Sequence, residues 1–304
     1  MTEHRLEFRI SENPWAPAAA VVEINERCGC GLELVGLAEQ EGGVSSAAFV
    51  RWPDGRDGAI SRSKLPLARM RQTAEAVNLA KAAGLPVARH ELVVQLSDGL
   101  VAIVQERLPG RHATRIDARV IDAVVETNER FAHLLAGRLD IPTSAAFPTQ
   151  DGGGHRWEET LGQYSDRTRR VLKRLYEIDG GELYAMTGDD LIHTDYSLGN
   201  LLFDEQGQIS GIVDWNFGAD RGDRRYALLG MRGYLAGDGR WHEGHDAASD
   251  RLEEVLATMI EPALLRTYLA HRAVHGLHGS IESFPHRPDR IERDLRAAEM
   301  QLAT

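Results

Sequence analysis

The sequence predicts an α+β fold with a small β-rich N-terminal lobe and a larger helical C-terminal lobe. Short strand-like segments separated by turn residues dominate up to about residue 110, and helical spacing of apolar residues dominates beyond it. The segment Leu108-Pro109-Gly110 breaks regular structure between the two patterns. We therefore expect an N-terminal lobe over residues 1–108 and a C-terminal lobe over residues 109–304.

The predicted N-terminal lobe is a sheet with one helix before it and one within it. A helix is expected over 17–28, because Pro17 opens the segment and Gly29 follows its end. A second helix is expected over 66–83, which stops at Gly84. Alternating and apolar runs bounded by turn residues predict strands at 32–38, 46–52, 58–63, 91–95 and 101–106.

The predicted C-terminal lobe is mostly helical. Apolar residues between 120 and 135 recur every three or four positions, as one buried face of a long helix requires. Residues 190–215 interrupt the helices with an island of strands and loops, and segments 143–155 and 237–248 are expected to be exposed loops. Further helices are expected over 157–178, 224–236, 249–273 and 287–302.

Composition excludes several classes of protein. The 304 residues are 42% hydrophobic, which is enough for a core without disulfides or a structural metal, so Cys28 and Cys30 are expected to be reduced thiols. The formal net charge of −11 argues against nucleic acid as a partner and favours a cationic one. No apolar run is long enough to span a membrane and the N-terminus does not resemble a signal peptide, so we expect a cytoplasmic protein with no membrane association.

The island at 190–215 holds the densest group of chemically capable residues. Its two strands turn at 204–207, so Asn200 and Asp214 are expected to meet at the open end of a hairpin. An amide oxygen and a carboxylate are hard oxygen ligands that suit Mg²⁺ with phosphate. Asp195 lies within reach of the same phosphate and could accept a proton from a substrate hydroxyl.

The run from His193 to Asn200 has the pattern H-x-D-x-x-x-x-N, and Ile212 to Trp215 read I-V-D-W. Together they resemble the catalytic and metal loops of the aminoglycoside phosphotransferase and choline kinase superfamily. This resemblance covers roughly residues 31–235 and implies a bilobal protein-kinase-like fold. It implies that Asp195 is the catalytic base, that Asn200 and Asp214 hold Mg²⁺, and that His193 supports the loop.

The resemblance also implies a site for ATP or GTP in the N-terminal lobe. The segment 41–46 lies where the family covers the phosphates, and its glycines and hydroxyls could donate to phosphate. The connector after the strand 101–106 resembles the hinge that binds the base through backbone groups. The candidate nucleotide-binding residues of these two segments are Gly43, Ser45, Ser46, Gln105, Glu106 and Arg107.

A cation that pairs with the phosphates is expected on the strand 58–63. Arg62 matches the family pattern best, and Lys64 is the alternative because it shares the same face by the period of two. Glu75 is the acidic residue that could orient this cation, with a solvated surface carboxylate as the other interpretation.

The acceptor site is less clearly marked. Asp223 lies near the family's Gly-Asp-Pro segment, where Arg224 replaces proline, and helix capping is its alternative role. Candidate lining residues are the aromatic and acidic side chains Tyr196, Trp215, Asp220, Asp223 and Glu282.

Charge and resemblance together favour a small cationic antibiotic with a free hydroxyl as substrate. An aminoglycoside or a tuberactinomycin such as capreomycin or viomycin fits this description, and phosphorylation would give resistance. A metabolic kinase for an amino alcohol or a sugar shares the same motifs. A nucleotide-binding pseudokinase is a third hypothesis, and the protein is expected to be a monomer or a homodimer.

Overall fold

The structure is a computed structural model that describes residues 16–37, 47–144, 157–178, 186–236 and 242–303. These residues form two compact units. The sheet unit holds the described residues of Trp15–Ser144 and Thr187–Met259, and the helical unit holds those of Ala145–Met186 and Ile260–Thr304. The described residues of the predicted N-terminal lobe all lie in the sheet unit, whereas those of the predicted C-terminal lobe are divided between the two units. The units therefore do not follow the predicted boundary at residue 108.

The sheet unit is built on a five-stranded antiparallel sheet with the strand order β1-β2-β3-β5-β4. All five strands and both helices predicted for this part of the chain are present. They are α1 (Pro17–Cys28), β1 (Glu33–Leu37), β2 (Ala48–Arg51), β3 (Asp57–Ser63), α2 (Leu67–Ala82), β4 (His90–Gln95) and β5 (Val101–Glu106).

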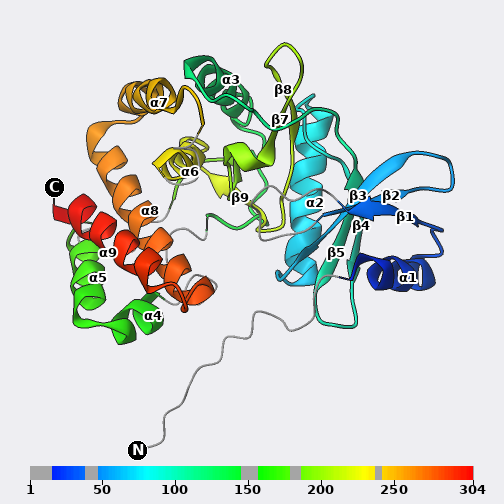
Figure 1. Cartoon of the computed structure of the whole chain (residues 1–304), viewed down its shortest axis with the longest axis horizontal. Coiled ribbons are helices and arrows are strands. Elements are labelled where there is room, and N and C mark those ends of the chain that lie inside the picture. The colour runs from blue at the N-terminus through cyan, green and yellow to red at the C-terminus, as the bar shows by residue number, and fades with distance from the viewer. Residues whose placement is uncertain (1–15, 38–46, 145–156, 179–185, 237–241, 304) are drawn as a thin grey trace, which may run out of the picture. The chain divides into compact units, whose positions relative to one another are not determined.

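The two helices cover opposite faces of this sheet (Figure 1). Ile24 of α1 packs in one cluster with Ile60 of β3. Met70 of α2 packs in another with Ile103 of β5. Side chains alternate between the faces of a strand, so the even-numbered residues of β3 face α1 and the odd-numbered residues face α2. This assignment decides which side chains of β3 can reach the candidate site.

The island at 190–215 folds as predicted into strands and loops. β6 (Asp190–His193) pairs with β9 (Ala219–Gly222), and β7 (Leu201–Phe203) pairs with β8 (Ile209–Ile212), both antiparallel. The helices of this part of the sheet unit are α3 (Ala118–Glu129), α6 (Arg225–Ala236) and α7 (His245–Met259).

The helical unit contains α4 (Trp157–Tyr164), α5 (Asp166–Ile178), α8 (Pro262–Ser283) and α9 (Pro288–Ala303). Their buried apolar side chains form one core, to which Trp157, Leu175, Leu277 and Leu295 belong. The helical pattern predicted over 157–178 is present and is divided between two helices. Ser165 separates α4 from α5, because its hydroxyl accepts from the Thr168 N–H at 3.2 Å and its own N–H donates to the Thr168 hydroxyl at 3.0 Å.

The helical pattern predicted over 249–273 is likewise divided between two helices, which extend beyond it at both ends. α7 begins earlier, within the expected loop, and ends at Met259. α8 then starts afresh at Pro262, where Glu261 accepts from the N–H groups of Ala263 and Leu264. Proline lacks an N–H and favours the first turn of a helix, which explains the break. None of the helices in the described ranges is long and apolar enough to cross a membrane.

Candidate active site

The loop after β6 is fastened to the core by His193. This side chain is buried, and its Nδ1 accepts from the main-chain N–H of Asp195 at 3.1 Å. The proton therefore resides on Nε2, which donates to the carbonyl oxygen of Val213 at 3.0 Å. Burial lowers the pKa of His193 and keeps the imidazole neutral. His193 thus links the loop that carries Asp195 to the strand that leads to Asp214.

Asn200 orients Asp195 directly. Its Nδ2 donates to the main-chain oxygen of Asp195 at 2.9 Å and to Oδ2 of the same residue at 3.0 Å. Because the nitrogen of the amide is used in this way, the amide oxygen is the atom that Asn200 can offer to a cation. The carboxylate of Asp195 is held at the surface of the loop, half-buried.

The hairpin of β7 and β8 brings Asn200 and Asp214 to the same end, as the sequence predicts. Leu201 lies opposite Ile212, and the N–H of Val213 donates to the carbonyl oxygen of Asn200 at 3.0 Å. Asp214 follows with φ +60°, a left-handed conformation that aspartate tolerates better than most residues. One carboxylate and one amide oxygen form a donor set that fits Mg²⁺.

The segment after Asp214 is clamped against β3. The Ser61 hydroxyl donates to Oδ1 of Asn216 at 2.8 Å, and the Ser63 hydroxyl donates to the Asn216 main-chain oxygen at 2.6 Å. Ser61, Ser63 and Asn216 are all buried. The odd-numbered face of β3 is therefore the one that meets the candidate metal loop.

The structure does not bring Arg62 to this loop. Arg62 lies on the even-numbered face, with Nη1 3.8 Å from the carboxylate of Asp98, and burial lowers its pKa. The alternative, Lys64, is exposed and lies beyond the end of β3. Strand alternation places Ser61, not Arg62, on the face that meets the segment after Asp214.

Glu75 does not orient a cation on the sheet. It is 63% exposed and pairs with Arg138 at 2.7 Å, which favours the interpretation as a surface carboxylate. Two other residues of α2 contact the metal segment, and sequence reasoning missed both. Arg69 donates to the carbonyl oxygen of Ala219 at 2.8 Å, and the Thr73 hydroxyl accepts from the N–H of Ala219 at 3.2 Å. Arg69 and Thr73 are four positions apart and so share one face of α2, which is the local sequence signal that could have identified them together.

The candidate hinge residues lie at the end of β5. Gln105 is buried, Glu106 pairs with Lys81 at 3.0 Å, and the guanidinium of Arg107 stacks 3.8 Å from the ring centre of Phe49. Gly43, Ser45 and Ser46 lie outside the described residues.

One row of cross-strand neighbours runs along the α2 side of the sheet to this hinge. Phe49 lies opposite Ala59, Ala59 opposite Gln105, and Gln105 opposite His90. Cross-strand partners share a face, so this row shares the face of Ser61. Burial lowers the pKa of His90 to about 4, and the neighbouring Gln105 side chain opposes the effect. His90 was not predictable from strand alternation, because an irregular register between His90 and Leu92 places it on this face.

Three predicted acceptor-site residues are engaged elsewhere. Tyr196 and Trp215 are core residues, each 1% exposed and packed edge-on against Phe131. The Tyr196 hydroxyl donates to the carbonyl oxygen of Val124 at 3.1 Å. Asp220 is buried and accepts from Arg69. The structure thus gives Tyr196 and Trp215 a packing role and Asp220 an ion pair, and their place in an acceptor site stays a prediction.

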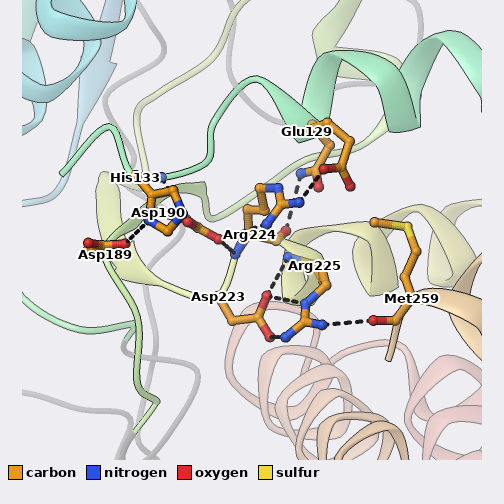
Figure 2. Close-up of polar contacts among 9 residues, drawn as sticks. Glu129, His133, Asp189, Asp190, Asp223, Arg224, Arg225 and Met259 are labelled. Carbon is orange, nitrogen blue, oxygen red and sulfur yellow. Dashed lines mark hydrogen bonds and ion pairs between the residues drawn. The ribbon is translucent and has the colours of Figure 1, made fainter. Parts of the chain in front are cut away.

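Asp223 is a structural carboxylate. Its Oδ1 accepts from the main-chain N–H of Arg225 at 3.0 Å, at the start of α6, and both oxygens accept from the Arg225 guanidinium at 2.8 and 2.7 Å (Figure 2). Arg225 also donates to the carbonyl oxygen of Met259 at 2.7 Å. The capping interpretation of Asp223 therefore fits the structure. Glu282 lies on α8 of the helical unit and accepts from the Thr160 hydroxyl.

Arg224 has its own role in the same region. It donates to Asp190 from Nη1 at 3.1 Å and from its main-chain nitrogen at 3.2 Å, and it pairs with Glu129 (Figure 2). The other oxygen of Asp190 accepts from the main-chain N–H of His133 at 2.9 Å. His133 and Asp189, whose side chains are 2.7 Å apart, complete a group of potential metal ligands. The contacts with Arg224 and His133 account for this group without an ion.

Comparison with known proteins identifies the family of the chain and its fold. A model of the phosphotransferase enzyme family matches residues 37–257. Among curated proteins, none matches the sequence significantly.

Several solved structures share the fold. A mutant of aminoglycoside phosphotransferase APH(4)-Ia, bound to AMP-PNP and hygromycin B, has 16% identity and a TM-score of 0.66 over 93% of this chain and 97% of that one. Amicoumacin kinase hAmiN, in a complex with AMP-PNP and Ca²⁺, has 13% identity and a TM-score of 0.68 over 95% and 94%. A GDP complex of aminoglycoside 2'-phosphotransferase-IIIa has 15% identity and a TM-score of 0.60 over 95% and 99%. The predicted α+β, protein-kinase-like fold is confirmed.

Proposed function

Because the chain belongs to the phosphotransferase enzyme family, we propose that it transfers the γ-phosphoryl group of ATP or GTP to a hydroxyl group of a cationic antibiotic. The observation that carries this proposal is the arrangement of Asp195, Asn200 and Asp214. The amide of Asn200 holds the carboxylate of Asp195, and the hairpin places Asp214 beside Asn200.

These residues support an in-line transfer. The substrate hydroxyl oxygen forms a bond to the γ-phosphorus while its proton passes to the carboxylate of Asp195. The bond from the γ-phosphorus to the bridging oxygen breaks, and the nucleoside diphosphate leaves with its electron pair. When bound, Mg²⁺ would be held by Asp214 and the amide oxygen of Asn200 and would neutralise charge on the phosphate oxygens.

The choice of acceptor follows from charge and from similar proteins. A net charge of −11 attracts a cationic substrate and repels an anionic one. One similar structure holds hygromycin B and another is an amicoumacin kinase, which supports an antibiotic as acceptor. We propose an aminoglycoside or a tuberactinomycin such as capreomycin or viomycin, modified in the cytoplasm by a monomer or a homodimer.

The test is a phosphorylation screen with the purified protein. ATP and GTP are supplied separately with Mg²⁺ to aminoglycosides, capreomycin, viomycin, choline and a sugar, and mass spectrometry detects the gain of one phosphate. Phosphorylation of a cationic antibiotic is the expected result. Phosphorylation of choline or the sugar alone would make the protein a metabolic kinase, and nucleotide binding without any turnover would make it a pseudokinase.

An Asp195→Asn variant tests the role of the base. We expect its kcat to fall at least about 100-fold with nucleotide affinity preserved, because the amide cannot accept the proton. Asp204→Asn is the matched control, since Asp204 lies in the exposed turn of the same hairpin and its Oδ1 accepts from the main-chain N–H groups of Gln206 and Gln208. Near-normal turnover by Asp195→Asn would overturn the assignment.

A further inference from the structure

A cation from α2 contacts the segment that follows Asp214. Arg69, in the first turn of this helix, donates from Nη2 to the carbonyl oxygen of Ala219 at 2.8 Å and also to the carboxylate of Asp220. The side chain of Arg69 is 17% exposed and that of Asp220 is 5% exposed. A charged pair this well shielded holds its geometry more firmly than an ion pair in solvent.

The backbone at this point is shaped around the guanidinium. Gly218 has φ +95°, and a Cβ at Gly218 would lie 3.0 Å from Nη2 of Arg69. Glycine is the residue that accepts both the left-handed conformation and the close approach. One turn further along α2, Thr73 accepts from the N–H of Ala219. Arg69 and Thr73 together bind both the N–H and the carbonyl oxygen of Ala219.

The contact between Arg69 and Ala219 lies at the end of a short loop that starts at Asp214, the candidate metal ligand. The segment begins where Val213 donates to Asn200, is held in its middle by Asn216, and ends at Ala219. Asp214 and Gly218 both have positive φ, so the segment depends on its surroundings to keep this shape. Fixing its far end limits the positions open to Asp214.

We propose that Arg69 is a positioning residue for phosphoryl transfer, holding the loop from Asp214 to Asp220 against α2 so that the Asp214 carboxylate keeps its metal-binding orientation. This inference rests on the proposed function. Through Arg69, α2 contributes to the site, although Glu75 of the same helix pairs with Arg138 instead. The cation Arg69 lies on α2, and its acidic partner Asp220 lies on β9.

The test compares Arg69→Met with Arg138→Met. Arg138 is a matched control, because its side chain is 26% exposed and ties Glu75 of α2 to a loop remote in sequence from Asp214. Mn²⁺ binding to the protein with a non-hydrolysable ATP analogue is measured by electron paramagnetic resonance, and kcat and KM are measured with the acceptor found in the screen. Thermal unfolding monitors the fold of each variant.

We expect Arg69→Met to raise the half-saturating Mn²⁺ concentration about tenfold and to lower kcat about tenfold or more, with a smaller change in the KM for the acceptor. Arg138→Met should leave Mn²⁺ affinity within about twofold of the wild type. Arg69→Lys keeps the charge and should recover much of the loss.

Mn²⁺ affinity of Arg69→Met within twofold of the wild type would overturn the inference while the proposed function stands. If Arg69→Met does not fold, Asp220→Asn decides the question by the same measurement, because it weakens the pair from the other side, and Mn²⁺ affinity within twofold of the wild type would overturn the inference. A wild-type protein that binds neither nucleotide nor Mn²⁺ would instead remove the proposed function.

Discussion

The side-chain amide of Asn200 donates two hydrogen bonds to Asp195, one to its main-chain oxygen and one to its carboxylate. A single residue therefore orients the candidate base and, through its remaining oxygen, offers a ligand to the candidate metal. The base and the metal site cannot be altered independently at this position.

Asn200→Asp should reduce kcat by about 100-fold or more, because a carboxylate cannot donate to Asp195 and repels it, and a small misplacement of a reacting group is costly. Gln206→Glu makes the same chemical change in the exposed turn of the hairpin and should leave kcat unchanged. Steady-state kinetics of the two variants at saturating Mg²⁺ gives the comparison. Equal kcat values for both variants would contradict the role of Asn200.

Two substitutions of Asp214 should both abolish activity but differ in their effect on stability. Asp214→Asn removes the charge but keeps a residue that tolerates φ +60°, so its free energy of unfolding should stay close to that of the wild type. Asp214→Ala should lose about 1 kcal/mol more, because alanine adopts the left-handed conformation poorly. Urea denaturation measures the difference, and both variants should lack phosphotransfer. The prediction fails if Asp214→Ala is as stable as Asp214→Asn.

Two adjacent carboxylates should differ sharply in their contribution to stability. Asp190 is buried and accepts from the main chain of His133 and from Arg224, whose guanidinium is 16% exposed. Asp190→Ala should therefore lower the free energy of unfolding by about 3 kcal/mol, since it removes a buried acceptor from the main-chain N–H groups of His133 and Arg224 and leaves the Arg224 guanidinium with Glu129 alone. Asp189→Ala should lower it by less than about 1 kcal/mol, because its partner His133 is largely exposed. Chemical denaturation at pH 7 distinguishes them, and similar losses would refute the prediction.

His90 should make the fold sensitive to acid. The pKa of His90 is about 4 in the folded chain and near 6.5 in the unfolded chain. Below pH 6.5 the unfolded state therefore binds a proton that the folded state does not bind until the pH approaches 4. The free energy of unfolding should fall by about 2 kcal/mol from this residue alone between pH 7 and pH 5. His193, also buried with a lowered pKa, adds to the loss in the same direction.

His90→Gln removes one of these two groups. We expect the variant to lose less stability than the wild type between pH 7 and pH 5, whatever its stability at pH 7. Urea denaturation of both proteins at the two pH values provides the test. An identical loss in the two proteins would show that His90 does not cause the acid sensitivity.

Local patterns were enough to predict the part of the site that lies within one hairpin. Asp195, Asn200 and Asp214 are close in the chain, and the turn between β7 and β8 alone brings the last two together. The strands and helices of the five-stranded sheet were also predictable, because alternation and terminal glycines mark them locally.

The cation on β3 was not predictable from the strand pattern. Arg62 and Ser61 are neighbours, and the face that each occupies depends on which helix covers which side of the sheet. The pair of Arg69 and Asp220 joins positions 151 residues apart, which no local pattern connects. Tyr196 and Trp215 follow the candidate residues Asp195 and Asp214 in sequence, but each is only 1% exposed and packs against Phe131, a contact that adjacency in sequence does not predict.

The interleaving of the two units has a consequence for synthesis on the ribosome. The chain leaves the sheet unit after Ser144, contributes α4 and α5 to the helical unit, and returns at Thr187. α4 and α5 emerge from the ribosome before α8 and α9, with which they share a core. The apolar faces of α4 and α5 therefore stay uncovered until α8 and α9 are translated, more than 80 residues later. During this interval the nascent chain exposes a hydrophobic surface that a chaperone can recognise, and the sheet unit is the first of the two to be complete.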